Sequence, residues 1–593
     1  MKRKRFLRKN VSPLVKTILG GNVNLMNIKT LYLAAAALLA AACTDSLPYD
    51  DEMDSEYVGK AVGNFAAEEW YPGGALGTAS NIAAGCYQDI APAASQEGMT
   101  TAFYKGERMF RASYSENSSS FPGLGPAYVR TSCMDCHPGY GHGQRITSYD
   151  TSSGSGNGCL LVAYHPDADN PNDGPFAAEL TAMPQTQAVA PFLPPIDGSQ
   201  VRIEWKTVAA MESGLPLQFP DGEAYELIYP EVSIPSSAFH TSPVPQNLAF
   251  RLESTIGING TGLLDAIDQD SIRKQYAATA AYALAAGHPE LINSDFWDIA
   301  ANDFAPGALY ALADGAFADG TAAKQGTKAL KRFTYAMTRA SLQDGPGANA
   351  LWNITNVSRA DRPFLYTTEA WARAMSESDE VIDRILADPT SPYNMNGDRE
   401  RTREAVRTLL SPGTNQHDNA YHKFLPEMTN DEFHEFMVWH RGLAVPRARE
   451  LNNVLVQRGK TLFMEIGCAE CHRPKWQTGD DNHWKPACMA DKALPRYKRQ
   501  TIYPYTDLMH HKLFMVNDIH GSWCRTTPLW GRGLSLRNTG AEDRLHDCRA
   551  RNEVEAIMWH CYSPKSHAYE SAHRFYLLPK EDRRALIRFI RAI

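Results

Sequence analysis

The segment Gly459–His472 reads G-K-T-L-F-M-E-I-G-C-A-E-C-H and ends in a C-x-x-C-H string, Cys468 to His472. This spacing is typical of covalent haem attachment, in which two thiols reach the two vinyl groups of one haem and the next residue presents an imidazole to the iron. Upstream of the string, apolar residues recur at helical spacing: Leu451, Val454, Leu455, Leu462 and Phe463. The segment therefore predicts a helix that leads into a haem-binding loop.

The same string occurs earlier, from Cys133 to His137, after a G-E-R-M-F stretch at 106–110 that resembles G-K-T-L-F at 459–463. A thioredoxin-like redox pair is a weaker interpretation, because it does not need the trailing histidine. A zinc site is weaker still, since His483 and Cys488 follow the second string but no comparable pair follows the first. We expect two covalently bound haem c groups, attached through Cys133, Cys136, Cys468 and Cys471, with His137 and His472 as iron ligands.

The rest of the chain predicts the architecture around these strings. Lys580–Ile593 follows Pro579 and has apolar residues at helical spacing, so a helix before the second haem loop would pack on a C-terminal helix, as in cytochrome c. Residues 201–208 and 223–234 alternate apolar and polar residues, which favours a small antiparallel β element. We expect a mainly α fold with two cytochrome c-like haem domains, 43–200 and 441–593, and a mixed α+β insertion, 201–440.

Three further helices are predicted within the insertion. Residues 275–287 and 369–386 have helical propensity, and Thr429 to Glu432 form a capping box for a helix after them. On that last helix His440 shares a face with apolar residues. We expect His440 to be a satisfied core residue.

The N-terminus has the features of an export signal. Basic residues precede an apolar run of 12 residues, Leu31 to Ala42, which is too short to span a bilayer but suits a secretory signal. The run ends at Cys43, as in a bacterial lipoprotein signal, so residues 1–42 are the expected signal and Cys43 the lipidation site; Met26 is a possible true start. An ordinary signal peptide is the alternative. We expect an exported cell-envelope lipoprotein, periplasm-facing or at the outer membrane.

Composition limits the partners and the chemistry of the remaining cysteines. The formal charge of -8 and the confinement of the basic cluster to the N-terminus argue against nucleic acid as the main partner. Of the 11 cysteines, six have no role in the signal or the haem strings. In an exported protein we expect them in structural disulfides rather than as reactive thiols, with the pairing left open: Cys86, Cys159, Cys488, Cys524, Cys548 and Cys561.

Several strings in order resemble the bacterial di-haem oxidoreductase family of peroxidases and thiol oxidoreductases, which is related to di-haem cytochrome c peroxidase and the MauG-type enzymes. The strings are G-L-G-P at 123–126, G-L-L-D-A-I at 262–267, L-A-V-P at 443–446, I-Y-P-Y-T-D-L at 502–508, R-T-T-P-L-W-G at 525–531, L-H-D at 545–547 and A-I-M-W-H at 556–560. The resemblance runs from about Gly106 to the C-terminus.

The chain departs from the family pattern at three places. The family's His-Asp-Met-Gly string, whose Met is the expected second ligand of the C-terminal haem, has no direct counterpart; Met515 is the first candidate, with Met509, His510 and His511 as alternatives. The glycines of the family's His-Asp-Gly and Trp-His-Gly strings are Cys548 and Cys561 here.

The resemblance implies a peroxidase-like oxidoreductase in which one haem relays electrons and the other meets the substrate, peroxide or another small oxidant. A redox protein or a small molecule would donate electrons, and the lipid anchor would bind the membrane. No distal acid is assigned; His142, His546 and Glu570 are weak candidates. The alternatives are a lipid-anchored electron-transfer cytochrome without peroxidase activity and a ferric-iron reductase in iron acquisition.

Overall fold

The computed structural model describes residues 54–115, 123–149, 158–166, 177–344, 350–415, 417–418, 420–421 and 425–593. Nearly all of these residues belong to one compact unit, Tyr57–Ile593, which is described by itself. The predicted signal and Cys43 lie outside the described residues. Among the residues that the structure describes, no helix has the length and apolar character needed to cross a membrane.

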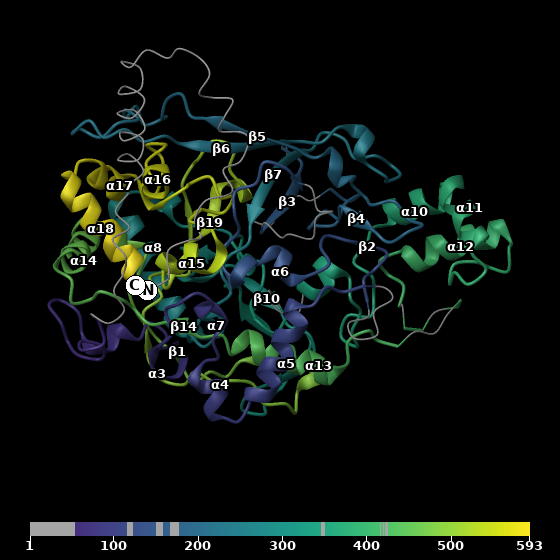
Figure 1. The fold of residues 1–593 in the computed structure, drawn as a ribbon, viewed down its shortest axis with the longest axis horizontal. Helices are drawn as coiled ribbons and strands as arrows, with labels where there is room; N and C mark the ends of the chain where they lie inside the picture. The colour runs from purple at the N-terminus through teal and green to yellow at the C-terminus, as the bar shows by residue number, and fades with distance from the viewer. Residues whose placement is uncertain are drawn as a thin grey trace, which may run out of the picture. The chain divides into compact units, whose positions relative to one another are not determined.

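The helix before the second haem string is α14 (Val454–Glu465), and it packs on the last helix, α18 (Lys580–Ala592), as predicted. The two meet at Gly459, where a Cβ atom would overlap the carbonyl oxygen of Ala585 and lie 2.6 Å from Cβ of Phe589. Only a residue without a side chain permits this approach. Figure 1 shows the two helices beside each other, α14 in green and α18 in yellow.

A second helix pair of the same kind stands before the first haem string. The helix α5 (Thr100–Arg111) packs on α13 (Asn430–Arg441), and a Cβ on Gly106 would overlap the carbonyl oxygen of Glu435 and lie 2.6 Å from Cβ of Trp439 (Figure 1). The helix α13 begins at the predicted capping box, in which Thr429 accepts from the backbone N–H of Glu432. The repeat of glycine and phenylalanine in the sequence therefore marks two glycine-centred helix contacts.

The partner helix of α5 is distant in sequence. Lys105 of α5 and Glu435 of α13 form an ion pair at 2.6 Å across a separation of 330 residues. This partner lies inside the range 201–440, which the sequence assigned to the insertion. The predicted domain boundaries remain predictions.

The predicted antiparallel element is present and larger than expected. Four antiparallel strands form one sheet in the order β3-β7-β6-β5: β3 (Cys159–Tyr164), β7 (Ala249–Ser254), β6 (Ile228–Ser233) and β5 (Arg202–Thr207). The register pairs Arg202 with Ser233 and Cys159 with Ser254. Leu160 of β3 packs in one apolar cluster with Cys136, so this sheet contacts the first haem string.

Short elements make up the rest. The remaining helices are α3 (Gly74–Gly77), α4 (Pro92–Gln96), α6 (Cys133–Cys136), α7 (Thr261–Asp265), α8 (Gln269–Ala286), α10 (Glu369–Glu377), α11 (Asp379–Ala387), α12 (Arg399–Leu410), α15 (Ser535–Thr539), α16 (Glu553–Trp559) and α17 (Tyr569–Tyr576). Small sheets join β1 (Thr78–Ala79) to β14 (Val445–Pro446), β2 (Ala127–Tyr128) to β4 (Gln187–Ala188), β8 (Trp297–Asp298) to β9 (Asp303–Phe304), β10 (Leu309–Ala311) to β13 (Lys328–Leu330), β11 (Gly315–Phe317) to β12 (Ala322–Ala323) and β16 (Trp484–Pro486), β15 (Trp476–Gln477) to β17 (Thr501–Ile502), and β18 (His510–Lys512) to β19 (Trp523–Arg525).

These elements correct the predicted fold class. The described part is mixed, with small sheets throughout the chain, and is not mainly α. The helix predicted at 369–386 is divided into α10 and α11 because Ser378 leaves the helical conformation and its side chain caps α11. The helix predicted at 275–287 is confirmed as α8, which begins earlier, at Gln269.

The C-terminal helix pair lies in a large apolar core. Leu462 and Phe463 of α14 and Leu586 and Phe589 of α18 are all buried there, together with Trp559 of α16. Burying a side chain of this size contributes about 1.5–3 kcal/mol. This core holds the C-terminal haem string against the two helices.

Candidate functional site

The second haem string leaves α14 through Gly467, whose φ of +94° turns the chain into a short 3-10 turn, Cys468–Glu470. The next histidine, His472, is half-buried, and its desolvation lowers the pKa of the imidazole to about 4. Its Nδ1 lies 3.1 Å from the carbonyl oxygen of Tyr505 and is placed to donate to it. A donor at Nδ1 leaves the lone pair of Nε2 for a metal.

The first haem string is arranged in the same way. Cys133 and Cys136 bound the one-turn helix α6, which Ser132 caps by accepting from the backbone N–H of Met134. Nδ1 of His137 lies 3.1 Å from the carbonyl oxygen of Ile256, and burial lowers the pKa of this imidazole to about 4. A ligating histidine commonly donates its second N–H to a carbonyl. Both predicted iron ligands therefore have the second hydrogen bond that fixes ring and tautomer.

A cavity of about 230 Å³ surrounds the second string. Its lining includes Cys468, Cys471 and His472, and helix residues from α16 and α18. A mostly apolar cavity with a few convergent polar groups is typical of a small-molecule or cofactor site. Four more histidines line it: His511, His546, His560 and His567.

Of these four histidines, His560 is arranged like the two predicted ligands. Its Nδ1 donates to the carbonyl oxygen of Ala556 at 2.6 Å, so Nε2 keeps its lone pair. Nε2 of His511 is held by Asp507 at 2.7 Å, and Nδ1 of His567 accepts from the backbone N–H of Lys512. In His546 both ring nitrogens have polar neighbours. His560 therefore fits best as a second ligand on this side.

The structure does not bring the predicted methionine ligands to this cavity. Met515 is buried in the C-terminal apolar core, and Met509 lies in another core, where the hydroxyl of Thr279 donates to its sulfur at 3.6 Å. Neither lines the cavity. His510 also faces elsewhere, with Nε2 3.2 Å from the carbonyl oxygen of Tyr335. Of the four candidates from the sequence, only His511 reaches the cavity wall.

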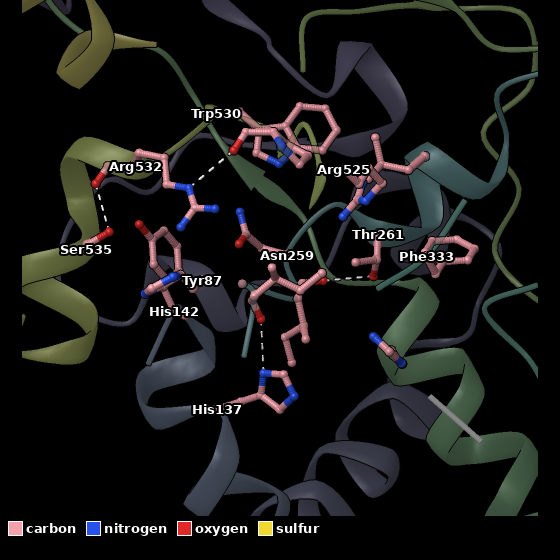
Figure 2. Close-up of a pocket in the computed structure, with 17 residues that line it drawn as sticks. Tyr87, His137, His142, Asn259, Thr261, Phe333, Arg525, Trp530, Arg532 and Ser535 are labelled. Carbon is pink, nitrogen blue, oxygen red and sulfur yellow. Dashed lines mark hydrogen bonds between the residues drawn. The ribbon is translucent and has the colours of Figure 1, made fainter. Parts of the chain in front are cut away.

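A smaller cavity, of about 60 Å³, lies beside His137. Figure 2 shows its lining, with His137 on one side and Trp530, Arg525 and Arg532 across the space from it. His440 of α13 also lines this cavity, and neither of its ring nitrogens has a hydrogen-bond partner. Burial, with a contribution from nearby His137, lowers the pKa of His440 to about 3.

The expectation that His440 is a satisfied core residue is thus wrong. A buried imidazole without partners loses the hydrogen bonds it makes to water, at a cost of about 1–3 kcal/mol. Such a group in a cavity wall indicates a partner that enters the cavity. The sequence signal was present, since His440 ends the apolar face of a capped helix, but the cavity forms only by tertiary contact.

The two cavities share part of their walls. His142, Arg525 and Arg532 line both of them. Burial lowers the pKa of Arg525 to about 10, and its Nη1 has no hydrogen-bond partner. No ion pair joins Arg525 or Arg532 to a carboxylate within the part of the chain that the structure describes. Buried guanidinium groups without a counterion favour an anion in the cavities.

These observations fit haem at both sites. Each cavity has a C-x-x-C-H string in or beside its wall, an imidazole oriented through Nδ1, and a second histidine. The shared arginines suit the two carboxylates of a haem, because guanidinium groups bind carboxylates strongly. Cys468 and Cys471 line the larger cavity, whereas Cys133 and Cys136 stand beside the smaller one without lining it.

The other residues considered from the sequence have different surroundings. His142 is buried with Nδ1 2.9 Å from the carbonyl oxygen of Gly143 and Nε2 2.8 Å from that of Leu545. Glu570 is exposed at the start of α17. None of the ten cysteines in the described part forms a disulfide, so the expected structural disulfides are not found there.

Comparison with known proteins gives a family match for the C-terminal part of the chain. Residues 414–593 match the family model described as "Di-haem oxidoreductase, putative peroxidase". The match contains His440, His472 and His560, and it supports the predicted family and an enzymatic activity. No curated protein was found to match the chain.

Proposed function

We propose that the protein is an exported di-haem c-type oxidoreductase of the peroxidase-like kind, in which the cavity beside His137 takes the substrate and the C-terminal haem relays electrons. The observation that carries this assignment is the difference between two histidines. His560 is fixed by its Nδ1 hydrogen bond, whereas His440 has no hydrogen bond at either nitrogen. A fixed imidazole suits a permanent ligand, and an unfixed one suits a site that opens to substrate.

The chain's own residues would hold the cofactors as follows. Cys133, Cys136, Cys468 and Cys471 would form thioether bonds, and Nε2 of His137 and of His472 would bind the two irons. Arg525 and Arg532, which line both cavities, would neutralise the carboxylates. When bound, haem would supply reversible one-electron chemistry and, at an open iron position, peroxide activation.

The role of His440 is to hold or move a proton in the first cavity. Its neutral imidazole has one N–H and one lone pair, so the lone pair can accept a proton from a bound peroxide and return it to the leaving oxygen. The walls around it are mostly apolar or buried, which keeps bulk water from competing for this proton. General acid–base assistance of this kind contributes roughly 10²–10⁴-fold to a rate.

Export and anchoring complete the proposal. The signal ahead of Cys43 would place the protein at the cell envelope, in the compartment where haem is attached covalently, with the lipid on Cys43 binding the membrane. A redox protein or a small molecule would supply electrons there.

A second candidate is a lipid-anchored electron carrier, and the same histidines favour it. If His440 and His560 both bind iron, each haem has two histidine ligands and no open position for peroxide. Both candidate functions use the same ligands, so the number of protein ligands bound to each iron decides between them.

The test combines spectroscopy with a matched pair of variants. Purified protein is examined by low-temperature EPR and UV–visible absorption in the oxidised, half-reduced and reduced states, with and without hydrogen peroxide. We expect one haem to open in the half-reduced state and respond to peroxide. His440→Ala should lower peroxide turnover about 10²–10⁴-fold, and His434→Ala, on the same helix but outside the cavity, should not. Two six-coordinate haems in every state, with no response to peroxide, would establish the carrier instead.

A further inference from the structure

Three residues outside the haem donor sets converge beside the larger cavity. Asp518 and Cys524 come from the hairpin β18–β19, and His546 lies in the segment before α16. One potential ligand atom from each lies within 4.8 Å of those of the other two. Nε2 of His546 is 2.9 Å from Oδ1 of Asp518, and Nδ1 of His546 is 3.8 Å from Sγ of Cys524.

The polar atoms of this group are buried and incompletely paired. The side chains of His546 and Asp518 are only 4% and 5% exposed. Oδ2 of Asp518 has no hydrogen-bond partner, whereas Nε2 of His546 faces the other oxygen of this carboxylate, Oδ1, at 2.9 Å. Each unpaired buried group of this kind costs about 1–3 kcal/mol or more if it is charged. A buried carboxylate oxygen without a partner, beside an imidazole and a thiol, is the arrangement expected at a cation site.

We propose that Asp518, Cys524 and His546 form a binding site for one Zn²⁺ ion. An oxygen, a sulfur and a nitrogen ligand together match the preference of zinc, which takes carboxylate, thiolate and imidazole donors at four positions. The harder cations Ca²⁺ and Mg²⁺ prefer oxygen alone. Because Cys524 and His546 also line the large cavity, the fourth position would face it and take a water molecule or a substrate atom.

Electrostatics agrees with a cation at this place. Burial raises the pKa of the Cys524 thiol well above its usual range, so without a cation the sulfur stays protonated. A bound Zn²⁺ reverses this, since a coordinating thiol loses its proton. Burial also raises the pKa of Asp518, but His546 and Arg549 more than offset that effect, and the carboxylate is ionised.

A second group of potential ligands does not compete with this site. Cys471, Asp507 and His511 also converge. In the proposed function the sulfur of Cys471 is a thioether to haem, which leaves it without a thiolate. Asp518, Cys524 and His546 have no part in holding haem, so the zinc site does not depend on the proposed function.

The test measures zinc and iron in the same sample. The whole protein is incubated with ZnCl₂, freed of unbound metal by gel filtration and assayed by mass spectrometry of both metals. We expect about one zinc per chain in the wild type, and its loss in Cys524→Ser and Asp518→Asn. Cys488→Ser, which changes a cysteine outside the group, should keep its zinc. Unchanged iron content and circular dichroism would show that the variants are folded and loaded with haem.

X-ray absorption at the zinc edge of the same holoprotein gives a measurement that needs no variant. One sulfur at about 2.3 Å and nitrogen or oxygen ligands at about 2.0–2.2 Å would support the site. A wild type that retains no zinc, a zinc spectrum without sulfur, or a Cys524→Ser protein with wild-type zinc would overturn it. Absence of haem would instead appear as missing iron, and failure of the peroxidase-like function as two six-coordinate haems that do not respond to peroxide, in both cases with zinc unaffected.

Discussion

Replacing Gly459 by alanine tests the glycine-centred helix contact most directly. The added Cβ would overlap the carbonyl oxygen of Ala585 and lie 2.6 Å from Cβ of Phe589, whereas ordinary contacts are 3.4–4 Å. The helices α14 and α18 must therefore separate by about an ångström. Overpacking of this kind costs about 1–3 kcal/mol, occasionally more.

Alanine also has a benefit, because it favours the helix over glycine by up to about 1 kcal/mol. We therefore expect a net loss of stability of about 1–2 kcal/mol, which should first affect the region where the two helices meet. Local opening of these helices should then increase about 5–30-fold. The C-terminal haem string follows α14 directly, so its cavity should loosen as well.

Hydrogen exchange followed by mass spectrometry measures this opening peptide by peptide. Peptides from 454–465 and 580–592 should exchange faster in Gly459→Ala, and those from α5 and α13 should not change. Gly413→Ala is the control, because nothing lies within 4 Å of a Cβ there. If Gly459→Ala exchanges like the wild type, the close contact does not hold these helices together and the argument is refuted.

Two further predictions concern the buried charges near the cavities. Burial raises the pKa of Glu553, but Arg544 and Arg591 more than offset this and lower it from 4.5 to about 2. The ionised Glu553 therefore adds about 3 kcal/mol to the free energy of unfolding. This stabilisation is present above pH 4.5 and is lost as the pH falls toward 2. The Tm of Glu553→Gln should therefore depend less on pH in that window, and parallel curves for variant and wild type would contradict the pairing. Arg525→Leu should lower the midpoint potentials of the haems in a redox titration, because a nearby positive charge favours the reduced state; equal potentials would show that Arg525 does not face them.

The sequence was most informative where covalent chemistry imposes a spacing. The two C-x-x-C-H strings predict His137 and His472 as iron ligands, because two thiols and one imidazole must reach the same haem. The glycine of each preceding repeat also marked the helix contact, since the same packing requires the same small residue at Gly106 and Gly459. Local patterns predicted the β5–β6 pair and the capped helix α13 for the same reason.

The histidines that could serve as second ligands, His440 and His560, could not be predicted from local sequence patterns. His440 and His560 matter because of the cavities they line, and those cavities are formed by segments distant in the chain. The prediction of Met515 relied on a family string that this chain lacks. The Trp559-His560-Cys561 string matches a family motif and so drew attention to His560, but the motif does not show where Nε2 of this histidine points.

The cysteines illustrate a similar limit. Disulfides were expected from the compartment alone, yet pairing requires sulfurs that meet in space. Cys524 instead lies beside an imidazole and a carboxylate, and Cys561 lies in the C-terminal apolar core. Only coordinates distinguish a thiol that packs from one that faces possible ligands.

The shared walls explain why the two haem sites need one continuous chain. The cavity beside His137 is closed on one side by Arg525, Trp530 and Arg532, which follow the second haem string. The larger cavity in turn includes His142, from the loop after the first string. Neither site is complete within its own repeat, because each takes residues from the other half of the sequence. Under the proposed function, Arg525 and Arg532 would therefore lie near both cofactors, so a change at either arginine should affect both sites.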